Sequence, residues 1–253
     1  MRYFFIEPRE AVGSSATIRG PDANHIKNVL RLQPGDEIRL FDGTGFEYEA
    51  RITHLSSSRV DVSILGGFAS SAESPVEIII AQAFLKEKKM DGLVRRLSEL
   101  GVTRWIPFFS DRSVSRPDSK RLSGRSQRWK KIARESVKQC RRGRIMEIAD
   151  TVSFEAVLNI GKESDLKVVF WENESNTLSL TGQRFKRVFA VLGPEGGLTL
   201  REIEIARSLG FITASLGPRI LKADTASIAA ATLLQFLFGD MGQNYIDKNS
   251  GFE

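Results

Sequence analysis

Residues 1 to about 72 alternate between apolar and polar positions in short stretches, the pattern of β-strands with one buried face. Two such stretches, Glu37–Phe41 and Tyr48–Ile52, are separated by turn-forming residues. In residues 22–32 the apolar positions instead recur at helical spacing, which predicts a short helix capped by Asp22. We therefore expect a small β-barrel of five or six strands with one short helix.

From residue 76 onward the pattern changes to an alternation of strands and helices. Apolar runs predict strands at residues 76–83, 104–109, 166–171, 188–192 and 211–216, and amphipathic stretches predict helices at residues 89–100, 125–140, 200–210 and 224–238. Gly101 and Gly210 are helix stop signals, and Thr199-Leu-Arg-Glu202 fits a capping box. This alternation predicts an α/β domain with a mainly parallel sheet, whose ligands bind at the carboxyl ends of the strands.

The last predicted helix is apolar almost all round, so we expect it in the core or at a subunit interface. Residues 66–75 are small and polar and end at Pro75, which predicts a linker. We accordingly expect a β-barrel domain at residues 1–72, an α/β domain at 73–242 and a polar C-terminal tail at 243–253.

The net charge of +6 over 253 residues is unevenly distributed. Residues 112–144 hold thirteen Lys and Arg against Asp118 and Glu135, a local balance of +11. Such segregation is typical of proteins that bind a phosphate backbone, although a solvated basic helix without a partner gives the same pattern.

Other features narrow the class of protein. The first residues show no secretory signal, and the longest apolar run, residues 226–238, is too short to span a bilayer. A single cysteine, Cys140, excludes an intramolecular disulfide, and with only His25 and His54 we expect no structural zinc site. We therefore expect a cytoplasmic protein without a membrane partner.

Two glycine-containing segments follow predicted strands in the last quarter of the chain. The first loop, Gly193-Pro-Glu-Gly-Gly197, lacks the endings of a P-loop and the spacing of a dinucleotide fingerprint. By itself it is better explained as a tight connector. The second loop, Leu216-Gly-Pro-Arg-Ile-Leu-Lys222, combines a rigid turn with two cations and leads into Ala223-Asp-Thr-Ala226. Its backbone amides could hold an adenine edge and the polar tail of a cofactor.

The pairing of these two segments resembles the signature of the ribosomal RNA small subunit methyltransferase E family, which belongs to the SPOUT class. Further matches run along nearly the whole chain in the family's order: His25 with Val29-Leu-Arg31, Gly35-Asp36, Phe41-Asp-Gly43, Lys86, Lys89-Met90, Glu99-Leu-Gly-Val102, Pro107, Arg112, Arg128-Trp129, Lys131-Ile-Ala133, Gln139 and Arg142. The sequence differs from the usual family residues at Lys222 (arginine), Asp224 (glutamate), Arg141 (glycine) and Met146 (proline). Lysine keeps the charge but loses the planar fork of arginine.

The resemblance implies a PUA-like barrel, a SPOUT domain with a trefoil knot, a homodimer, and methylation of N3 of one uridine in 16S rRNA of the small ribosomal subunit. It also implies that S-adenosylmethionine binds at the two loops and a neighbouring strand end. The implied cofactor-binding residues are Trp171, Leu192, Gly193, Glu195, Gly196, Gly197, Leu216, Gly217, Ile220, Leu221, Lys222, Thr225 and Ala226.

Methyl transfer to N3 of uracil requires removal of its proton and stabilisation of the resulting anion. The α/β half contains no histidine. Our hypothesis is that Arg219 and Lys222 stabilise the negative charge and that Asp224 or Glu195 accepts the proton. Structural explanations of the two carboxylates weigh at least as much as catalysis: Asp224 could only cap the last helix, and Glu195 could only brace its loop.

We expect RNA contacts from the barrel and from the basic segment; the candidates are Arg9, Arg31, Lys86, Arg112, Arg128 and Arg142. We expect His25 to be packed rather than functional, Trp129 to face the core, and Cys140 to be a small buried hydrophobe. Two other functions stay open: a ribose 2′-O-methyltransferase of the same superfamily, and an RNA-binding assembly factor that has lost its cofactor.

Overall fold

The computed structural model describes residues 2–7, 11–56, 58–86, 89–179 and 183–242. The contacts divide the chain into two compact units, each with its own core. The first is Met1–Glu73 with Glu135–Ile145, and the second is Ser74–Arg134 with the chain from Met146 onward. The division after residue 73 lies next to the expected boundary, whereas residues 135–145 join the first unit instead of the second. The expected tail at residues 243–253 lies outside the described residues.

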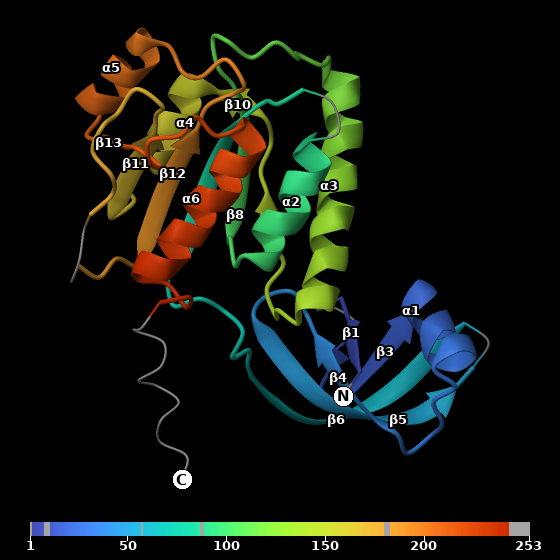
Figure 1. The fold of residues 1–253 in the computed structure, drawn as a ribbon. Helices are drawn as coiled ribbons and strands as arrows, with labels where there is room; N and C mark the ends of the chain where they lie inside the picture. Colours follow the sequence, from blue (N-terminus) through green and yellow to red (C-terminus); the bar gives the residue numbers. More distant parts are fainter. Residues whose placement is uncertain (1, 8–10, 57, 87–88, 180–182, 243–253) are drawn as a thin grey trace. The chain divides into compact units, whose positions relative to one another are not determined.

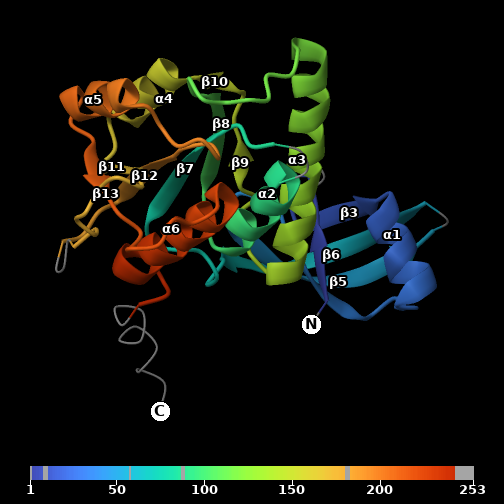
Figure 2. The same cartoon turned by 45° about the horizontal axis from the view of Figure 1, so that its top comes forward.

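The first unit is built on a six-stranded sheet that curls around its core (Figures 1 and 2). Its strands, in the spatial order β1-β4-β5-β6-β3-β2, are β1 (Tyr3–Phe5), β2 (Ala11–Val12), β3 (Ser15–Arg19), β4 (Glu37–Phe41), β5 (Phe46–Leu55) and β6 (Arg59–Ala69). β1 pairs parallel with β4, and the other neighbours are antiparallel. Alternate residues such as Ile38, Leu40, Ala50 and Ile52 are buried, as the two-residue period predicted. The linker begins later than expected, because β6 runs through residues 66–69.

The short helix differs from the prediction. Helix α1 (Pro21–Asn24) begins after Gly20 and continues into a π-helical turn, η2 (His25–Val29). Pro21 stands at the first helical position, so the prediction that Asp22 caps the helix is wrong. The carboxylate of Asp22 instead accepts from Nζ of Lys138 at 3.0 Å. The His25 side chain is exposed, so the expectation that it is packed is also wrong.

A buried ion pair fixes residues 141–145 within the first unit. Arg142 is 2% exposed and places Nη2 2.8 Å from the Glu73 carboxylate, which also accepts from the backbone amide of Arg144. Tyr3 donates its hydroxyl to the Arg142 carbonyl at 3.3 Å. Arg142 is therefore engaged in structural contacts, which corrects its selection as an RNA contact: the sequence shows the charge but not its burial. Arg141, directly after α3, has a φ of 60°, in the left-handed region.

The second unit contains an all-parallel sheet in the order β10-β8-β7-β12-β11-β13, with β9 also pairing with β8. The strands are β7 (Glu77–Ala83), β8 (Arg104–Phe109), β9 (Glu147–Ile148), β10 (Val152–Ser153), β11 (Leu166–Phe170), β12 (Arg187–Leu192) and β13 (Ile212–Ala214). Because neighbouring strands run in the same direction, the carboxyl ends of β12, β11 and β13 lie side by side.

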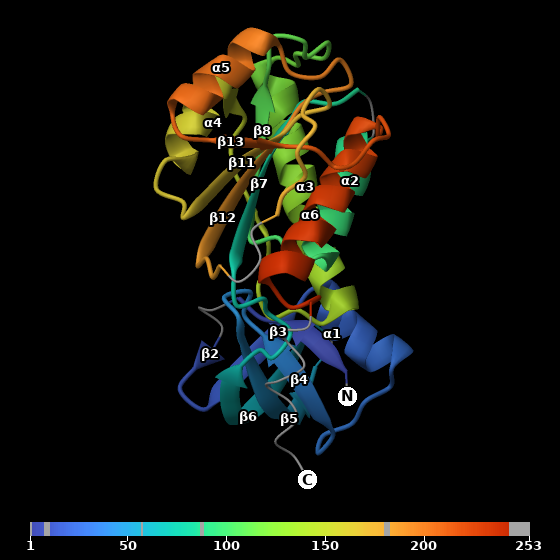
Figure 3. The same cartoon turned by 60° about the vertical axis from the view of Figure 1, so that its left-hand side comes forward.

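Helices cover both faces of this sheet (Figure 3). The helices are α2 (Lys89–Glu99), α3 (Ser119–Cys140), α4 (Phe154–Gly161), α5 (Leu200–Ser208) and α6 (Ala223–Phe238). α4 and α5 cover one face, where Phe154, Val157 and Ile203 pack with Ile79 and Phe189. α2 and α6 contact each other, and α6 lies on β7 and β12.

The structure confirms most of the predicted starts and ends of the helices. Thr199 and Glu202 form the predicted capping box at the start of α5, and Gly101 and Gly210 both have positive φ angles after their helices. α3 begins six residues earlier than predicted, at Ser119. α4, β9 and β10 were not predicted. No helix among the described residues is long and apolar enough to cross a membrane.

Candidate active site

A cavity of about 560 Å³ lies at the carboxyl ends of β11, β12 and β13. We call it the strand-end cavity. Its volume is within the range of small-molecule sites, about 300–1,000 Å³. It is lined by the first loop, the second loop, and residues from the end of β11; the lining residues are Lys89, Phe170, Trp171, Glu172, Leu192, Gly193, Pro194, Glu195, Gly196, Gly197, Ser215, Leu216, Gly217, Pro218, Arg219, Ile220, Leu221, Lys222, Ala223 and Ala226.

The structure brings nearly all the predicted cofactor-binding residues into this one cavity. The exception is Thr225, whose side chain is exposed and which is not among the lining residues. Asp224 also lies outside the lining, in the first turn of α6. The residue before α6 is Lys222, so Asp224 is not the cap of that helix.

The first loop makes a turn that a side chain would obstruct. Gly197 has a φ of 70°, and a Cβ atom there would overlap the Glu172 carboxylate, which itself lines the cavity. Arg112 donates from Nη1 to the Gly196 carbonyl at 2.9 Å and so supports the loop from outside. The backbone of this loop can therefore approach a bound molecule closely.

Glu195 acts as a brace for the first loop. Its Oε1 accepts from Nζ of Lys89 at 3.0 Å and from the backbone amide of Lys86 at 3.2 Å. Burial works to raise the pKa of Glu195, but hydrogen bonds from its own amide, from Lys89 and from Lys86 outweigh it and lower the pKa. A carboxylate stabilised in this way is a poor proton acceptor.

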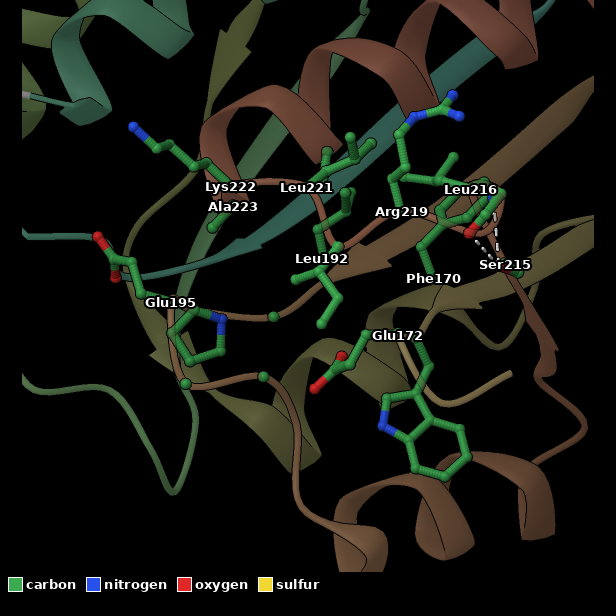
Figure 4. A pocket seen from close by; sticks show the side chains of 18 of the residues that line it. Phe170, Glu172, Leu192, Glu195, Ser215, Leu216, Arg219, Leu221, Lys222 and Ala223 are labelled. Atoms are coloured by element: carbon green, nitrogen blue, oxygen red, sulfur yellow. Dashed lines mark hydrogen bonds between the residues drawn. The ribbon is translucent and has the colours of Figure 1, made fainter. Parts of the chain in front are cut away.

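The second loop presents both apolar side chains and backbone donors. Leu192, Leu216 and Leu221 give the cavity apolar walls, and Figure 4 shows Leu192 between the two loops. The backbone amides of Ile220 and Leu221 have no protein partner among the described residues. Apolar walls beside free backbone amides suit a flat heteroaromatic group that carries acceptor nitrogens.

The two predicted catalytic cations stand at the rim of the cavity. Arg219 and Lys222 are both exposed, and within the described part of the chain neither has an ion-pair partner. In Figure 4 their side chains extend in different directions, with Lys222 on the side of Glu195. One oxygen of Asp224 is buried and has no hydrogen-bond partner among the described residues.

Comparison with known proteins identifies the kind of domain that carries this cavity. Residues 72–235 match the family model of an RNA methyltransferase domain, and residues 18–65 match that of an RNA methyltransferase PUA domain. The ribosomal RNA small subunit methyltransferase E of Bacillus subtilis (strain 168) is 30% identical over 93% of this chain and 96% of its own length. The chain belongs to the ribosomal RNA small subunit methyltransferase E family.

Solved structures agree with this assignment. A crystal structure of a ribosomal RNA small subunit methyltransferase E from Neisseria gonorrhoeae bound to S-adenosyl methionine is 30% identical, with a TM-score of 0.84, and the match covers 95% of this chain and 99% of that one. A Legionella pneumophila protein crystallised with the bound cofactor SAM is 28% identical, with a TM-score of 0.81 over 94% of this chain and 98% of that one. The family resemblance and the PUA-like and SPOUT-type fold inferred from sequence are confirmed.

The remaining RNA candidates of this family member are distributed over both units. Lys86 and Arg112 are exposed and both contact the first loop, through the Lys86 amide and the Arg112 guanidinium. Arg128 is exposed and pairs with Asp91 at 2.7 Å, and Arg31 is exposed in the first unit. Arg9 lies outside the described residues. RNA contact by these residues stays a prediction.

Two packing expectations have different outcomes. Trp129 is 1% exposed and donates its indole N–H to Asp91 at 3.0 Å, so the prediction that it faces the core is confirmed. Cys140 is only half-buried, with Sγ 3.8 Å from the Val137 carbonyl, so the prediction that it is a small buried hydrophobe is wrong.

Sequence reasoning missed the polar side chains that brace the walls of the cavity. Gln82 is fully buried at the end of β7 and donates to the Gly193 carbonyl at 3.0 Å. Lys89 anchors Glu195, and Arg207 lies over the ring of Trp171, 5.7 Å from its centroid. The one available signal was Gln82, a polar residue at a position of β7 where the sequence pattern demands an apolar one.

Proposed function

We propose that this chain transfers a methyl group from S-adenosylmethionine to N3 of a uridine in the 16S rRNA of the small ribosomal subunit. The observation that carries the proposal is the strand-end cavity, where two glycine-containing loops enclose a space of about 560 Å³. Membership in the ribosomal RNA small subunit methyltransferase E family supports the substrate class, and the adenosyl cofactor bound to the Neisseria gonorrhoeae relative supports the donor.

The residues present fit an adenosyl sulfonium. The free backbone amides of Ile220 and Leu221 can donate to an adenine edge, and the leucine side chains can cover its faces. The turn at Gly197 leaves room because it has no Cβ, and the Glu172 carboxylate beside it can attract the positive sulfonium or the amino group of the methionine part.

When bound, the cofactor supplies a methyl group already activated by its sulfonium. The chain must then hold uracil N3 in line with that carbon and stabilise the anion that forms as N3 loses its proton. Arg219 and Lys222 are assigned the stabilisation of negative charge on the uracil oxygens, since both stand at the cavity rim without an ion-pair partner among the described residues. Glu195 is committed to Lys89, so we retain Asp224 as the proton acceptor. Asp224 directly follows the lining residue Ala223 and keeps one oxygen without a hydrogen-bond partner among the described residues.

The proposal includes the partners expected from the family resemblance. The RNA-contacting residues are assigned to Arg31, Lys86, Arg112 and Arg128, all exposed cations. A homodimer is supported by exposed apolar residues of the second unit: Ile220 is 89% exposed and Phe236, on α6, is 56% exposed. The trefoil knot belongs to the proposal as a family property, and the cytoplasm is the proposed location because the substrate is ribosomal.

The test incubates small subunits that lack the modification with labelled S-adenosylmethionine and maps the methyl group after digestion to nucleosides. N3-methyluridine is the expected product. A 2′-O-methylated nucleoside would replace the proposal by ribose methylation. Absence of cofactor binding in calorimetry would leave an RNA-binding factor without enzymatic activity.

Arg219 is tested separately by Arg219→Ala, with Arg201→Ala as the control because Arg201 is an exposed arginine on α5 outside the cavity. Loss of one charge-stabilising group should lower kcat by about 100- to 1,000-fold, with cofactor affinity unchanged. Normal turnover in Arg219→Ala removes this residue from the mechanism.

A further inference from the structure

Gln82 is the last residue of β7 whose side chain points to the α6 face of the sheet. The alternate residues Ile79, Ala81 and Ala83 belong to the core under α4 and α5, so Ile78, Ile80 and Gln82 face the other way. Gln82 is 0% exposed. A primary amide in such a place costs free energy unless its donors and its acceptor are all engaged.

The amide of Gln82 is engaged on three sides. Its Nε2 donates to the Gly193 carbonyl and to the Ala83 carbonyl, both at 3.0 Å, and its Oε1 accepts from the Ser227 hydroxyl. The orientation of the amide is fixed, because a flipped amide would point its oxygen at two carbonyl oxygens. The Ser227 hydroxyl has one proton and lies near two acceptors, the Gln82 amide oxygen and the Ala223 carbonyl 2.9 Å away. Because the Ala223 carbonyl already accepts the backbone amide of Ser227 in the helix, the hydroxyl proton can go to Gln82.

These contacts connect the two walls of the strand-end cavity. Gly193 is the first residue of the first loop, and Ser227 lies on α6 one helical turn after Ala223, which lines the cavity. Gln82 is not itself a lining residue of the cavity. It stands behind the cavity and links the first loop to the helix that carries the second loop.

We propose that Gln82 and Ser227 are positioning residues that set the separation of the two cavity walls and thereby the affinity for the methyl donor. The proposal rests on the proposed function, since the occupant it concerns is S-adenosylmethionine. A side chain that acts only by holding the walls should change the binding of the cofactor and leave the rate of the bound complex nearly unchanged.

A second buried glutamine provides a matched control. Gln235 on α6 is also 0% exposed, donates to the Leu100 carbonyl at 2.8 Å and accepts from the Ser74 hydroxyl at 2.8 Å. It is not a lining residue, and its side-chain hydrogen bonds to Ser74 and Leu100 reach neither loop. Gln235 therefore satisfies buried partners without touching the cavity walls. Comparing substitutions at Gln82 and Gln235 separates an effect on the stability of the fold from an effect on the position of the walls.

The experiment compares Gln82→Met with Gln235→Met in the full chain. Both substitutions leave buried carbonyl and hydroxyl groups without partners and should lower the melting temperature. Only Gln82→Met should weaken S-adenosylmethionine binding in calorimetry, by about tenfold or more, with a matching rise in the KM for the cofactor and little change in kcat. Equal cofactor affinity in the two variants, whether retained or lost, overturns the proposal.

Ser227→Ala keeps the test decisive if Gln82→Met does not fold. Its control is Ser98→Ala, because Ser98 is also a fully buried helical serine, with its hydroxyl 2.8 Å from the carbonyl four residues earlier. Ser227→Ala should weaken cofactor binding several-fold and Ser98→Ala should not. If the wild type itself binds no S-adenosylmethionine, the proposed function fails; if the wild type and both controls bind and the Gln82 and Ser227 variants bind equally well, only the positioning role fails.

Discussion

Gly197→Ala tests whether the left-handed turn of the first loop is needed for cofactor binding. Gly197 has a φ of 70°, where an alanine costs about 1–2 kcal/mol relative to its preferred conformations. The added Cβ would also overlap the Glu172 carboxylate, so that side chain must leave its present position. The substitution therefore has two consequences, one for the stability of the fold and one for the shape of the cavity.

Gly210→Ala separates these consequences. Gly210 has a φ of 78° at the end of α5, and the nearest atom to an added Cβ is the flexible Nζ of Lys167 at 3.3 Å. Both variants should lose about 1–2 kcal/mol, a fall of roughly 2–8 °C in melting temperature for a chain of this size. Only Gly197→Ala displaces a residue that lines the cavity, so only this variant should lose affinity for S-adenosylmethionine, by about tenfold.

The assay is calorimetric titration of each variant with S-adenosylmethionine beside a thermal melt. Adding Glu172→Ala to Gly197→Ala removes the obstructing carboxylate, so affinity should return to that of Glu172→Ala alone while the melting temperature stays low. If Gly197→Ala and Gly210→Ala bind the cofactor equally well, the turn is only a connector and the steric reasoning is refuted.

Two further variants test other parts of the chain. Arg141→Gly should stabilise the protein by about 1 kcal/mol in thermal melts, because Arg141 has a φ of 60° directly after α3. The control Lys131→Gly, inside α3, should destabilise the protein by a similar amount. A loss of stability in Arg141→Gly contradicts the strain argument. The lowered pKa of Glu195 means that its stabilising contacts are present above its ordinary pKa of 4.5 and are lost as the pH falls through the lowered value. In Lys89→Met the pKa of Glu195 should rise, so on acidification the affinity for the cofactor should begin to fall at a higher pH than in the wild type. Identical pH profiles of the two proteins would exclude the Lys89 contact as the cause of that fall.

The sequence predicted those parts of the fold that depend on local signals. β8 has the predicted bounds, Arg104–Phe109, because an apolar run of strand length lies between polar residues. α3 begins six residues before its predicted start. The helix is capped by Asp118, which precedes its first residue and whose side chain accepts from the backbone amide of Arg121 at 2.8 Å. α4 was missed although Ser153 caps it, because eight residues give only two helical turns of periodicity.

The candidate site was predictable as far as it consists of backbone turns. Glycine and proline mark the first and second loops in the sequence, and a parallel sheet brings neighbouring strand ends together. The bracing of these loops was not predictable, because it depends on partners far away in the chain. Glu195 meets Lys89 across 106 residues, and Gln82 meets Gly193 across 111. No local pattern specifies such pairs.

The positions of charged and polar residues in the sequence nevertheless carry more information about the fold than the net charge does. Arg142 was counted among thirteen cations of a basic segment, yet it is 2% exposed and pairs with Glu73. Gln82 lies within an apolar strand, yet its amide joins the first loop to α6. Because an unpaired buried polar group costs free energy, a polar residue at a position whose neighbours are buried implies a partner elsewhere in the chain. The sequence shows that such a partner must exist, and only the tertiary structure shows which residue it is.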